Sequence, residues 1–283
     1  MLGCFLVFGE NIFLCYTGRN LVTINFFVKT MESRPYLSII IPAYNESGRK
    51  GEELKKNLQE IGEYLGKKNI DYEVIGVNDG SKDDTAEFFR HCSGLVKRLE
   101  VIDRKVNRGK WFSVREGLLR ARGEYRLFTD SDGATSITNL ENFWPYMEKG
   151  EDIIIGSRDL ADSKIEKHQP KWKEMLGDLG NYLIQFMLGL RGIKDTQCGF
   201  KVLSRKATEE IIPLMQVDRW GGDFEMLMLA RKLKYEIIQV PVVWEDAGLS
   251  LVGATGLGGY SSTLKELFQV KWKMLTGQYK FKK

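Results

Sequence analysis

The chain has 283 residues and a mass of 32.5 kDa, a size that predicts about one or two domains. Hydrophobic residues make up 43% of the sequence and charged residues 28%, which excludes a disordered chain, a collagen-like repeat and a polytopic membrane protein. The net charge of +4 is too small to indicate a nucleic-acid-binding protein.

Cysteines and histidines exclude several kinds of site. The four cysteines lie far apart and form no CxxC pair, which indicates neither a disulfide framework nor a zinc site and fits a reducing compartment. With two histidines, His91 and His168, neither a histidine metal cluster nor a Ser-His-Asp triad is expected. Any metal would therefore be held by carboxylates and would be a hard cation such as Mg²⁺ or Mn²⁺.

Residues 1–35 are predicted to be separate from the rest of the chain. The first thirty are apolar and aromatic, but Glu10 and Arg19 interrupt them, and no charge-free run reaches the ~18 residues of a spanning helix. A signal peptide is also a poor match, because no basic region precedes the apolar part. Three interpretations remain open: a weak membrane anchor, an extra element that docks on the domain, or a translated leader upstream of a natural start at Met31.

From residue 36 onward, β-branched runs alternate with helical patterns, as in a mostly parallel sheet covered by helices. No repeat or Pro/Gly-rich linker interrupts residues 37–245, so we expect one Rossmann-like α/β domain over residues 36–260, followed by an amphipathic helix over residues 261–283. Ser81 and Asp84 resemble a capping box and predict a helix that begins near Ser81. The predicted strands span residues 37–41, 72–77, 98–102, 125–129, 152–156 and 235–244, and the spacing of apolar residues predicts helices over residues 54–65 and 114–119.

Polar residues follow four of these strands, at the edge where ligands bind in open α/β sheets. Each segment alone is no more than a turn or a helix cap, but their repetition at equivalent strand ends predicts a binding site. The most distinctive pair is Asp130 and Asp132, because two carboxylates at i and i+2 can converge on one hard cation and leave positions for phosphate oxygens. The plainer interpretation of such a pair is a solvated acidic turn. The four segments are residues 42–46, 78–81, 130–134 and 157–159.

The same segments follow one another in the order of a known family: PAYNE (42–46), VNDGSKDDT (77–85), NRGK (107–110), DSDGAT (130–135), GSRD (156–159) and DTQCGFK (195–201). They resemble the inverting family 2 glycosyltransferases of GT-A fold, and within them the dolichyl-phosphate β-glucosyltransferases and their polyprenyl-phosphate relatives. The resemblance covers residues 36 to 281. It implies transfer of a hexose, with inversion, from a nucleotide sugar such as UDP-glucose to a dolichyl or polyprenyl phosphate.

The resemblance also implies roles on the donor side. Asp130 and Asp132 would hold Mg²⁺ or Mn²⁺ on the diphosphate, Asp79 would contact the uridine, and Lys110 would face the donor. Two departures from the family pattern are visible: Asn78 replaces an acid, and Trp111-Phe112 stands where small residues are usual and would fill space beside the donor. The nucleotide pocket would be lined by Pro42, Ala43, Tyr44 and Glu46.

On the acceptor side, the phosphate monoester is already largely dianionic at neutral pH, so positive charge matters more than a base. Arg158 and Lys201 would lie near phosphates, and Asp223 or Glu225 would act if a base is needed; each of these acids is equally well interpreted as a first-turn helix residue. Cys198 is interpreted as a packed small residue, because no base is adjacent. Further candidate side chains are Arg219, Lys171 and Lys173 for the phosphate and Trp220 and Trp244 for the sugar or lipid, with surface or core positions as the alternatives.

A lipid acceptor implies a membrane-facing surface, which two amphipathic segments could provide at the cytoplasmic face of a membrane. Residues 176–190 carry one apolar stripe, and the C-terminal helix combines apolar residues with lysines, a pattern typical of interfacial helices. The alternative is that both helices only cover the sheet. The stripe comprises Leu176, Leu179, Leu183, Phe186, Met187 and Leu190, and the C-terminal residues are Leu264, Leu267, Phe268 and Leu275 with Lys265, Lys271, Lys273, Lys280, Lys282 and Lys283.

Three other functions remain as alternatives. The first keeps the lipid acceptor but uses GDP-mannose as donor. The second is a processive polysaccharide synthase, suggested by QVDRW (216–220), although such enzymes thread their polymer through several membrane helices. The third is a catalytically silent protein that binds nucleotide sugars, which the intact Asp130-Ser131-Asp132 segment disfavours.

Overall fold

The computed structural model describes residues 12–17, 20–25, 34–167, 171–245 and 257–281. The chain separates into two compact units, residues 1–34 and residues 35–283. The N-terminal unit contains an antiparallel hairpin of β1 (Ile12–Thr17) and β2 (Asn20–Asn25). A hairpin is compatible with each interpretation of the first thirty residues, so these interpretations, and the predicted domain boundaries, stay predictions.

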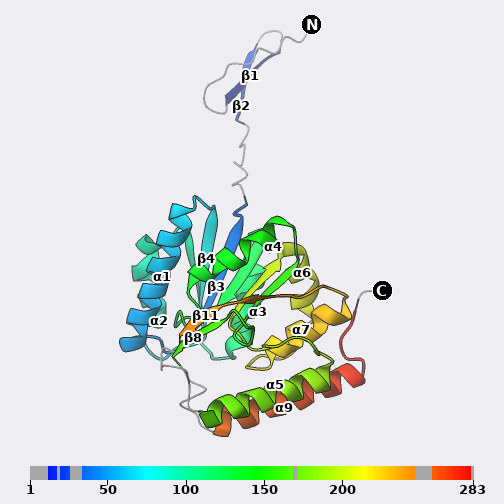
Figure 1. The fold of residues 1–283 in the computed structure, drawn as a ribbon. Coiled ribbons are helices and arrows are strands. Elements are labelled where there is room, and N and C mark those ends of the chain that lie inside the picture. Colours follow the sequence, from blue (N-terminus) through cyan, green and yellow to red (C-terminus); the bar gives the residue numbers. More distant parts are fainter. Residues whose placement is uncertain (1–11, 18–19, 26–33, 168–170, 246–256, 282–283) are drawn as a thin grey trace. The chain divides into compact units, whose positions relative to one another are not determined.

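The main unit, residues 35–283, is built on a seven-stranded sheet of order β10-β7-β9-β6-β3-β4-β5 (Figure 1). Neighbouring strands run parallel except at β9, which is antiparallel to both β6 and β7. The predicted α/β fold with one mostly parallel sheet is confirmed. The strands are β3 (Leu37–Ala43), β4 (Tyr72–Asn78), β5 (Leu99–Asp103), β6 (Tyr125–Thr129), β7 (Ile153–Ser157), β9 (Phe200–Ser204) and β10 (Ile238–Pro241).

Helices cover both faces of this sheet, which is why β3, β4, β6 and β7 are buried along their whole length. Alternate residues of β3 therefore enter different cores: Ile40 packs in the core that contains α3, and Ile39 in the core that contains α1. The helices are α1 (Arg49–Lys67), α2 (Thr85–His91), α3 (Lys110–Arg120), α4 (Trp144–Glu148), α5 (Lys171–Leu188), α6 (Arg205–Ile211), α7 (Gly222–Lys232) and α9 (Leu257–Leu275).

Three local features differ from the prediction. The strand expected over residues 235–244 is divided at Pro241: β10 pairs with β7, whereas β11 (Val243–Glu245) pairs with β8 (Lys164–Lys167) in a second small sheet. Proline lacks the amide hydrogen that would continue the first ladder. The antiparallel strand β9 was not predicted. The capping box is wrong as well, because α2 begins at Thr85 and Ser81 instead donates its hydroxyl to Asn78.

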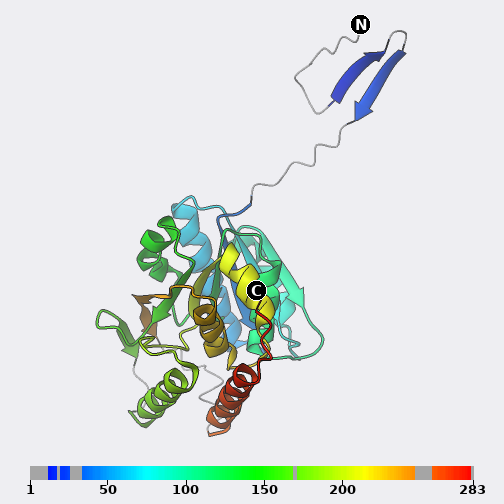
Figure 2. The same ribbon diagram turned by 90° about the vertical axis from the view of Figure 1, so that its right-hand side faces the viewer.

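Helices α5 and α9 lie side by side at the end of the main unit (Figure 1, Figure 2). The Lys271 ammonium donates to the Met187 carbonyl across this contact at 2.6 Å. The predicted C-terminal helix is thus present and begins at Leu257. Among the described residues, every helix is too short or too polar to cross a bilayer.

Candidate active site

Two cavities that share part of their walls lie at the carboxyl ends of the strands. The first, the strand-end cavity, has a volume of about 360 Å³ and is lined by residues that follow β3, β4 and β6. The second, the interhelix cavity, has a volume of about 420 Å³ and extends from these strand ends to α5 and α9. Lys110, Asp130, Asp132 and Trp220 line both cavities. The predicted acidic pair therefore lies where the two cavities meet.

The strand-end cavity brings together the residues expected around the nucleotide. Because β3 and β4 are parallel, with Ala43 opposite Asn78, the segments that follow them reach the same edge of the sheet. Their contact with a nucleotide stays a prediction. Pro42, Ala43, Tyr44, Glu46, Asp79, Lys110 and Asp130 all line this cavity.

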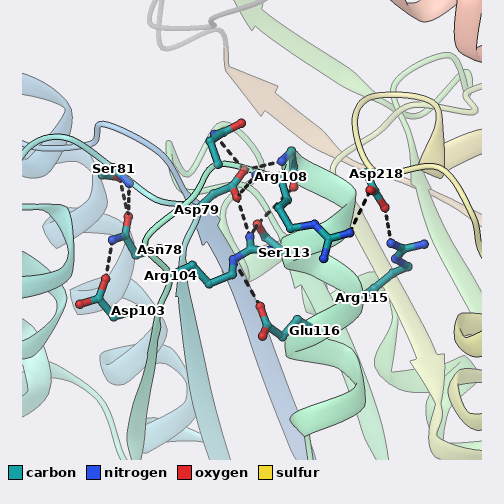
Figure 3. Close-up of polar contacts among 12 residues, drawn as sticks. Asn78, Asp79, Ser81, Asp103, Arg104, Arg108, Ser113, Arg115, Glu116 and Asp218 are labelled. Carbon is teal, nitrogen blue, oxygen red and sulfur yellow. Dashed lines mark hydrogen bonds and ion pairs between the residues drawn. The ribbon is translucent and has the colours of Figure 1, made fainter.

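Asp79 organises the wall of the strand-end cavity (Figure 3). Its Oδ1 accepts the Arg108 amide at 2.8 Å and the Arg104 guanidinium at 2.6 Å. Its Oδ2 accepts the Gly109 amide at 2.8 Å and the Asn107 side chain at 3.0 Å. The carboxylate thus fixes the turn that precedes α3, and a direct contact with uridine would use an oxygen that already has two donors.

At the two departures from the family pattern, the side chains contact other groups of the protein. Asn78 donates to Asp103 at 2.8 Å and accepts the Ser81 amide at 3.2 Å, so its amide links the end of β5 to the turn that follows β4. Trp111 is 1% exposed, and Phe112 packs against the Arg108 guanidinium, whose carbon lies 3.5 Å from the ring centroid. Neither aromatic side chain lines either cavity, and their expected place beside the donor stays a prediction.

The acidic pair is held by several neighbours. Lys110 places its Nζ 2.7 Å from Asp130 Oδ1, and the Asn57 amide donates to the Asp130 carbonyl at 3.1 Å. A Cβ at position 199 would lie 2.0 Å from Asp130 Oδ2, so a larger residue there would displace this carboxylate. Burial alone would lower the pKa of Lys110, but the nearby carboxylates, Asp130 foremost, hold the pKa above its usual value. Lys110 is therefore a cation at neutral pH.

Carboxylates near this point could hold a hard divalent cation. Burial raises the pKa of Glu46 to about 7, although Lys50 opposes the shift, and the charge of Asp132 raises it further. Within the described part of the chain, no three His, Cys, Asp or Glu side chains form a complete metal site. Mg²⁺ and Mn²⁺ commonly take two carboxylates and complete their shell with phosphate oxygens and water. The donor set of Asp130 and Asp132 fits such an ion.

Arg158 follows β7 and marks the charged end of the interhelix cavity. Its Nε donates to Asp195 Oδ2 at 2.7 Å and its terminal nitrogen to Oδ1 at 3.0 Å, a two-point pairing that fixes the guanidinium plane. The guanidinium also lies 5.5 Å from the Trp244 ring centroid. Asp195 had no predicted role, although it opens the DTQCGFK segment; its pairing with an arginine 37 residues away is visible only in the fold.

The Asp195→Asn variant is expected to be less stable by about 2 kcal/mol at pH 7. Burial would raise the pKa of Asp195, but Arg158 lowers it to about 2, so the folded state favours the carboxylate. This stabilisation is present above the unfolded pKa of about 4 and is lost as the pH falls from 4 to 2. Urea unfolding from pH 7 to pH 2 measures it. The exposed Asp162→Asn variant is the control, and a stability difference that does not shrink below pH 4 would contradict the expectation.

The remaining candidate acids and cations, Asp223, Lys201 and Glu225, are all buried, and Asp223 also lines a cavity. Asp223, in the first turn of α7, lines the interhelix cavity. Lys201 is 0% exposed and donates to Asp223 Oδ1 and to the Cys198 carbonyl, each at 2.5 Å. Glu225 is also 0% exposed and accepts the Gln216 and Val217 amides, which keeps it away from both cavities.

The other candidate residues either line a cavity, are buried, or lie outside the described side chains. Arg219 and Trp220 line the strand-end cavity, and Trp220 and Trp244 line the interhelix cavity. Burial raises the pKa of Cys198 to about 12, in agreement with a packed, unreactive thiol. The side chains of His168, Lys171 and Lys173 lie outside the described residues.

The far end of the interhelix cavity is apolar. It is bounded by leucines of α5 and α9 and by two glycines, Gly177 and Gly180, at which an added Cβ would meet no atom within 4 Å. The cavity thus joins cations and carboxylates at one end to a hydrocarbon wall at the other. The apolar residues are Leu176, Leu179, Leu183, Ile184, Leu264 and Leu267.

Comparison with known proteins identifies the class to which this site belongs. Residues 38–212 match the model of a family described as glycosyl transferase family 2, and the chain belongs to that family. It is 36% identical to a dolichyl-phosphate β-glucosyltransferase of Trichomonas vaginalis, over 81% of this chain and 72% of the relative. It is 32% identical to the dolichyl-phosphate β-glucosyltransferase of Homo sapiens, over 86% of this chain and 77% of the relative.

Solved structures agree on the fold. The glucosyl-3-phosphoglycerate synthase of Mycobacterium tuberculosis superposes with a TM-score of 0.61 at 16% identity, covering 83% of this chain and 80% of that chain. The same synthase in complex with Mn²⁺, UDP-glucose and phosphoglyceric acid gives a TM-score of 0.59 at 15% identity, covering 84% of this chain and 80% of that chain. The predicted GT-A fold is confirmed.

Proposed function

We propose that this protein transfers glucose from UDP-glucose to dolichyl or polyprenyl phosphate, with inversion at the anomeric carbon. The observation that carries the proposal is the interhelix cavity, which has a charged end at the acidic pair and an apolar end between two helices. An isoprenoid phosphate has the same two-part chemistry. The names of the relatives support glucose and a dolichyl phosphate acceptor, and the Mycobacterium synthase supports UDP-glucose and Mn²⁺.

The donor would occupy the strand-end cavity, with its diphosphate at the junction. Asp130 and Asp132 would hold Mg²⁺ or Mn²⁺ there, and the ion would supply positive charge to the leaving diphosphate. Lys110 adds a second positive charge at the same point, since its ammonium lies 2.7 Å from Asp130 and lines both cavities.

In the reaction, an acceptor phosphate oxygen forms a bond to the anomeric carbon as the bond from that carbon to the diphosphate oxygen breaks. The electron pair of the broken bond leaves with UDP. A dianionic acceptor loses no proton; when the acceptor enters as the monoanion, its proton passes to Asp223. Arg158 offsets the charge of the incoming phosphate, which must approach a second anion.

We also propose that α5 and α9 rest on the cytoplasmic face of a membrane. Each helix presents an exposed apolar stripe at helical spacing, and the side chains of both stripes are at least 42% exposed. Leu183, Met187, Leu190 and Leu267 of the predicted stripes are instead buried or packed against the core. The exposed side chains are Met175, Leu179, Tyr182 and Phe186 on α5, and Leu264, Phe268, Trp272 and Leu275 on α9.

The predicted lysines have different environments. Lys265 and Lys280 are exposed, as contact with anionic lipid requires. Lys271 and Lys273 donate to the Met187 and Gln216 carbonyls, at 2.6 and 3.5 Å, and so also tie α9 to the domain. Lys282 and Lys283 lie outside the described residues.

Replacing Phe268 and Trp272 by Ser is expected to weaken binding to anionic vesicles at least ~10-fold, because each exposed aromatic ring that enters the membrane contributes about 1 kcal/mol or more. Co-sedimentation with phosphatidylserine-containing vesicles measures the loss. Turnover of a short-chain, water-soluble acceptor should be unchanged. Leu119→Ser is the matched control, because Leu119 is 53% exposed but lies on α3. Equal vesicle binding by the control and by the Phe268/Trp272 variant would contradict membrane contact.

Incubation with membranes and labelled nucleotide sugars, followed by lipid extraction, tests the proposed reaction. UDP-glucose should give an extractable glucosyl phospholipid, and GDP-mannose should not. Preference for mannose would replace the donor, and a long water-soluble polymer would indicate a processive synthase. Binding of UDP-glucose without any product would indicate a silent nucleotide-sugar-binding protein.

A further inference from the structure

We propose that Trp111 is a positioning residue for Asp223: its indole N–H holds this carboxylate at the charged end of the interhelix cavity. The inference rests on the proposed function, in which Asp223 lies beside the acceptor phosphate. Trp111 does not itself line either cavity, so it acts on the reaction only through Asp223.

Buried donors fix both oxygens of Asp223. The Trp111 Nε1 donates to Oδ2 at 2.7 Å, and the Lys201 Nζ donates to Oδ1 at 2.5 Å. The two donor residues are 1% and 0% exposed, and Asp223 itself is 3% exposed. With water kept from the back of the carboxylate, its orientation toward the cavity is set by these two contacts.

The surrounding packing is shaped to the indole. The Trp111 ring meets the Phe128 ring edge-on, with centroids 5.4 Å apart. A Cβ at position 222 would lie 2.1 Å from Trp111 Cγ, so only glycine fits at the first residue of α7. The Trp111 amide also donates to the Arg219 carbonyl at 3.3 Å, just before α7. The start of α3 and the start of α7 are therefore interlocked through this side chain.

Consecutive residues of α3 thus reach the two acids that the reaction would use. Lys110 pairs with Asp130 at the junction of the cavities, and Trp111 bonds to Asp223 on the acceptor side. One helical turn therefore sets the spacing between the donor-side and acceptor-side carboxylates. A small side chain at position 111 would remove the donor to Oδ2 and leave the carboxylate held by Lys201 alone.

A double-mutant cycle tests the proposal in the full chain. Trp111→Phe is expected to lower kcat for glucosyl transfer about 10- to 100-fold, as small misplacements of catalytic groups do, while UDP affinity measured by calorimetry changes less than about twofold. Asp223→Asn is expected to lower kcat at least ~100-fold. In the Asp223→Asn background, Trp111→Phe should cost less than about threefold, because the group it positions is already gone.

The matched control is Trp144→Phe. The Trp144 indole donates to the Tyr64 hydroxyl at 2.8 Å, and neither residue lines the two cavities, so the same chemical change should leave kcat unaltered. Additive losses in the Trp111/Asp223 cycle would overturn the proposal, and so would a loss of UDP affinity equal to the loss of kcat. If Trp111→Phe does not fold, site-specific replacement of the Trp111 indole by benzothiophene removes the N–H at constant shape and carries the same expectations.

A failure of the proposed function can be distinguished from a failure of the proposed Trp111–Asp223 positioning. If the unaltered protein makes no glucosyl lipid, that function fails, and the positioning is then decided by the indole N–H resonance of Trp111. Asp223→Asn should move this resonance clearly in the nitrogen-proton NMR spectrum and leave that of Trp144 in place. An unmoved Trp111 resonance would overturn the positioning whatever the reaction.

Discussion

The Asp132→Ala variant should lose glucosyl transfer by at least ~10³-fold and should no longer respond to added Mg²⁺ or Mn²⁺. Asp132 supplies one of two carboxylates at the junction of the cavities, and a metal-stabilised leaving group is worth several kcal/mol, at about 1.4 kcal/mol for each factor of ten in rate. Initial rates of lipid-linked glucose formation over a range of Mn²⁺ concentrations measure the loss. Paramagnetic resonance of Mn²⁺ reports ion binding independently of turnover.

Asp84→Ala is the control for this change. Asp84 is exposed, precedes α2 and makes no side-chain capping bond, so its removal should leave both metal response and rate intact. Normal turnover by Asp132→Ala, or a rate that still rises with Mn²⁺, would refute the assignment of the metal to the acidic pair.

The edge of the sheet that holds the site could be predicted from sequence because its cause is local. A buried strand is recognised in the sequence as a run of β-branched residues, and polar residues directly after it must lie at the carboxyl end of the strand. Parallel pairing then brings the ends of β3, β4 and β6 to one edge without further information. Asp79, Lys110 and the acidic pair lie around one cavity for this reason.

The side chains behind that edge could not be predicted, because tertiary packing decides which polar groups are buried. Lys201 and Glu225 stand in the same kinds of motif as Arg158 and Asp223, yet they line neither cavity, whereas Arg158 and Asp223 line the interhelix cavity. Lys201 and Glu225 are both 0% exposed and bonded to protein groups. Lys201 belongs to β9, an antiparallel strand inserted between β6 and β7 that no local pattern indicated. Its insertion turns the lysine toward Asp223 and away from solvent.

Helix amphipathicity was likewise only half predictable. Helical spacing correctly places apolar residues along α5, but this helix is apolar on two sides. Ile184 and Leu188 are buried, whereas Leu179 and Phe186, from the same apolar sequence, are exposed. Only the position of α9 beside α5 shows which side is left without a protein neighbour in the described part of the chain.

Arg158→Ala should lower kcat/KM for the isoprenoid phosphate about 100-fold and leave UDP affinity within about twofold. The guanidinium lines the interhelix cavity but not the strand-end cavity, so its charge is available to the acceptor phosphate and not to the nucleoside. A lost charge-assisted contact to phosphate costs about 1.5–3 kcal/mol, which is one to two factors of ten. Acceptor saturation curves, with UDP binding measured by calorimetry, separate the two effects.

Two further variants identify the cause of that loss. Arg158→Lys keeps the charge but cannot form the two-point pairing with Asp195, so it should recover only part of the activity. Arg205→Ala is the matched control, since Arg205 is similarly exposed and also pairs with an acid, Glu124, but lines neither cavity. If Arg158→Ala weakens the binding of UDP as strongly as that of the acceptor, the guanidinium binds the donor diphosphate. The acceptor phosphate must then be held by another cation at the junction, such as Lys110, which lines both cavities.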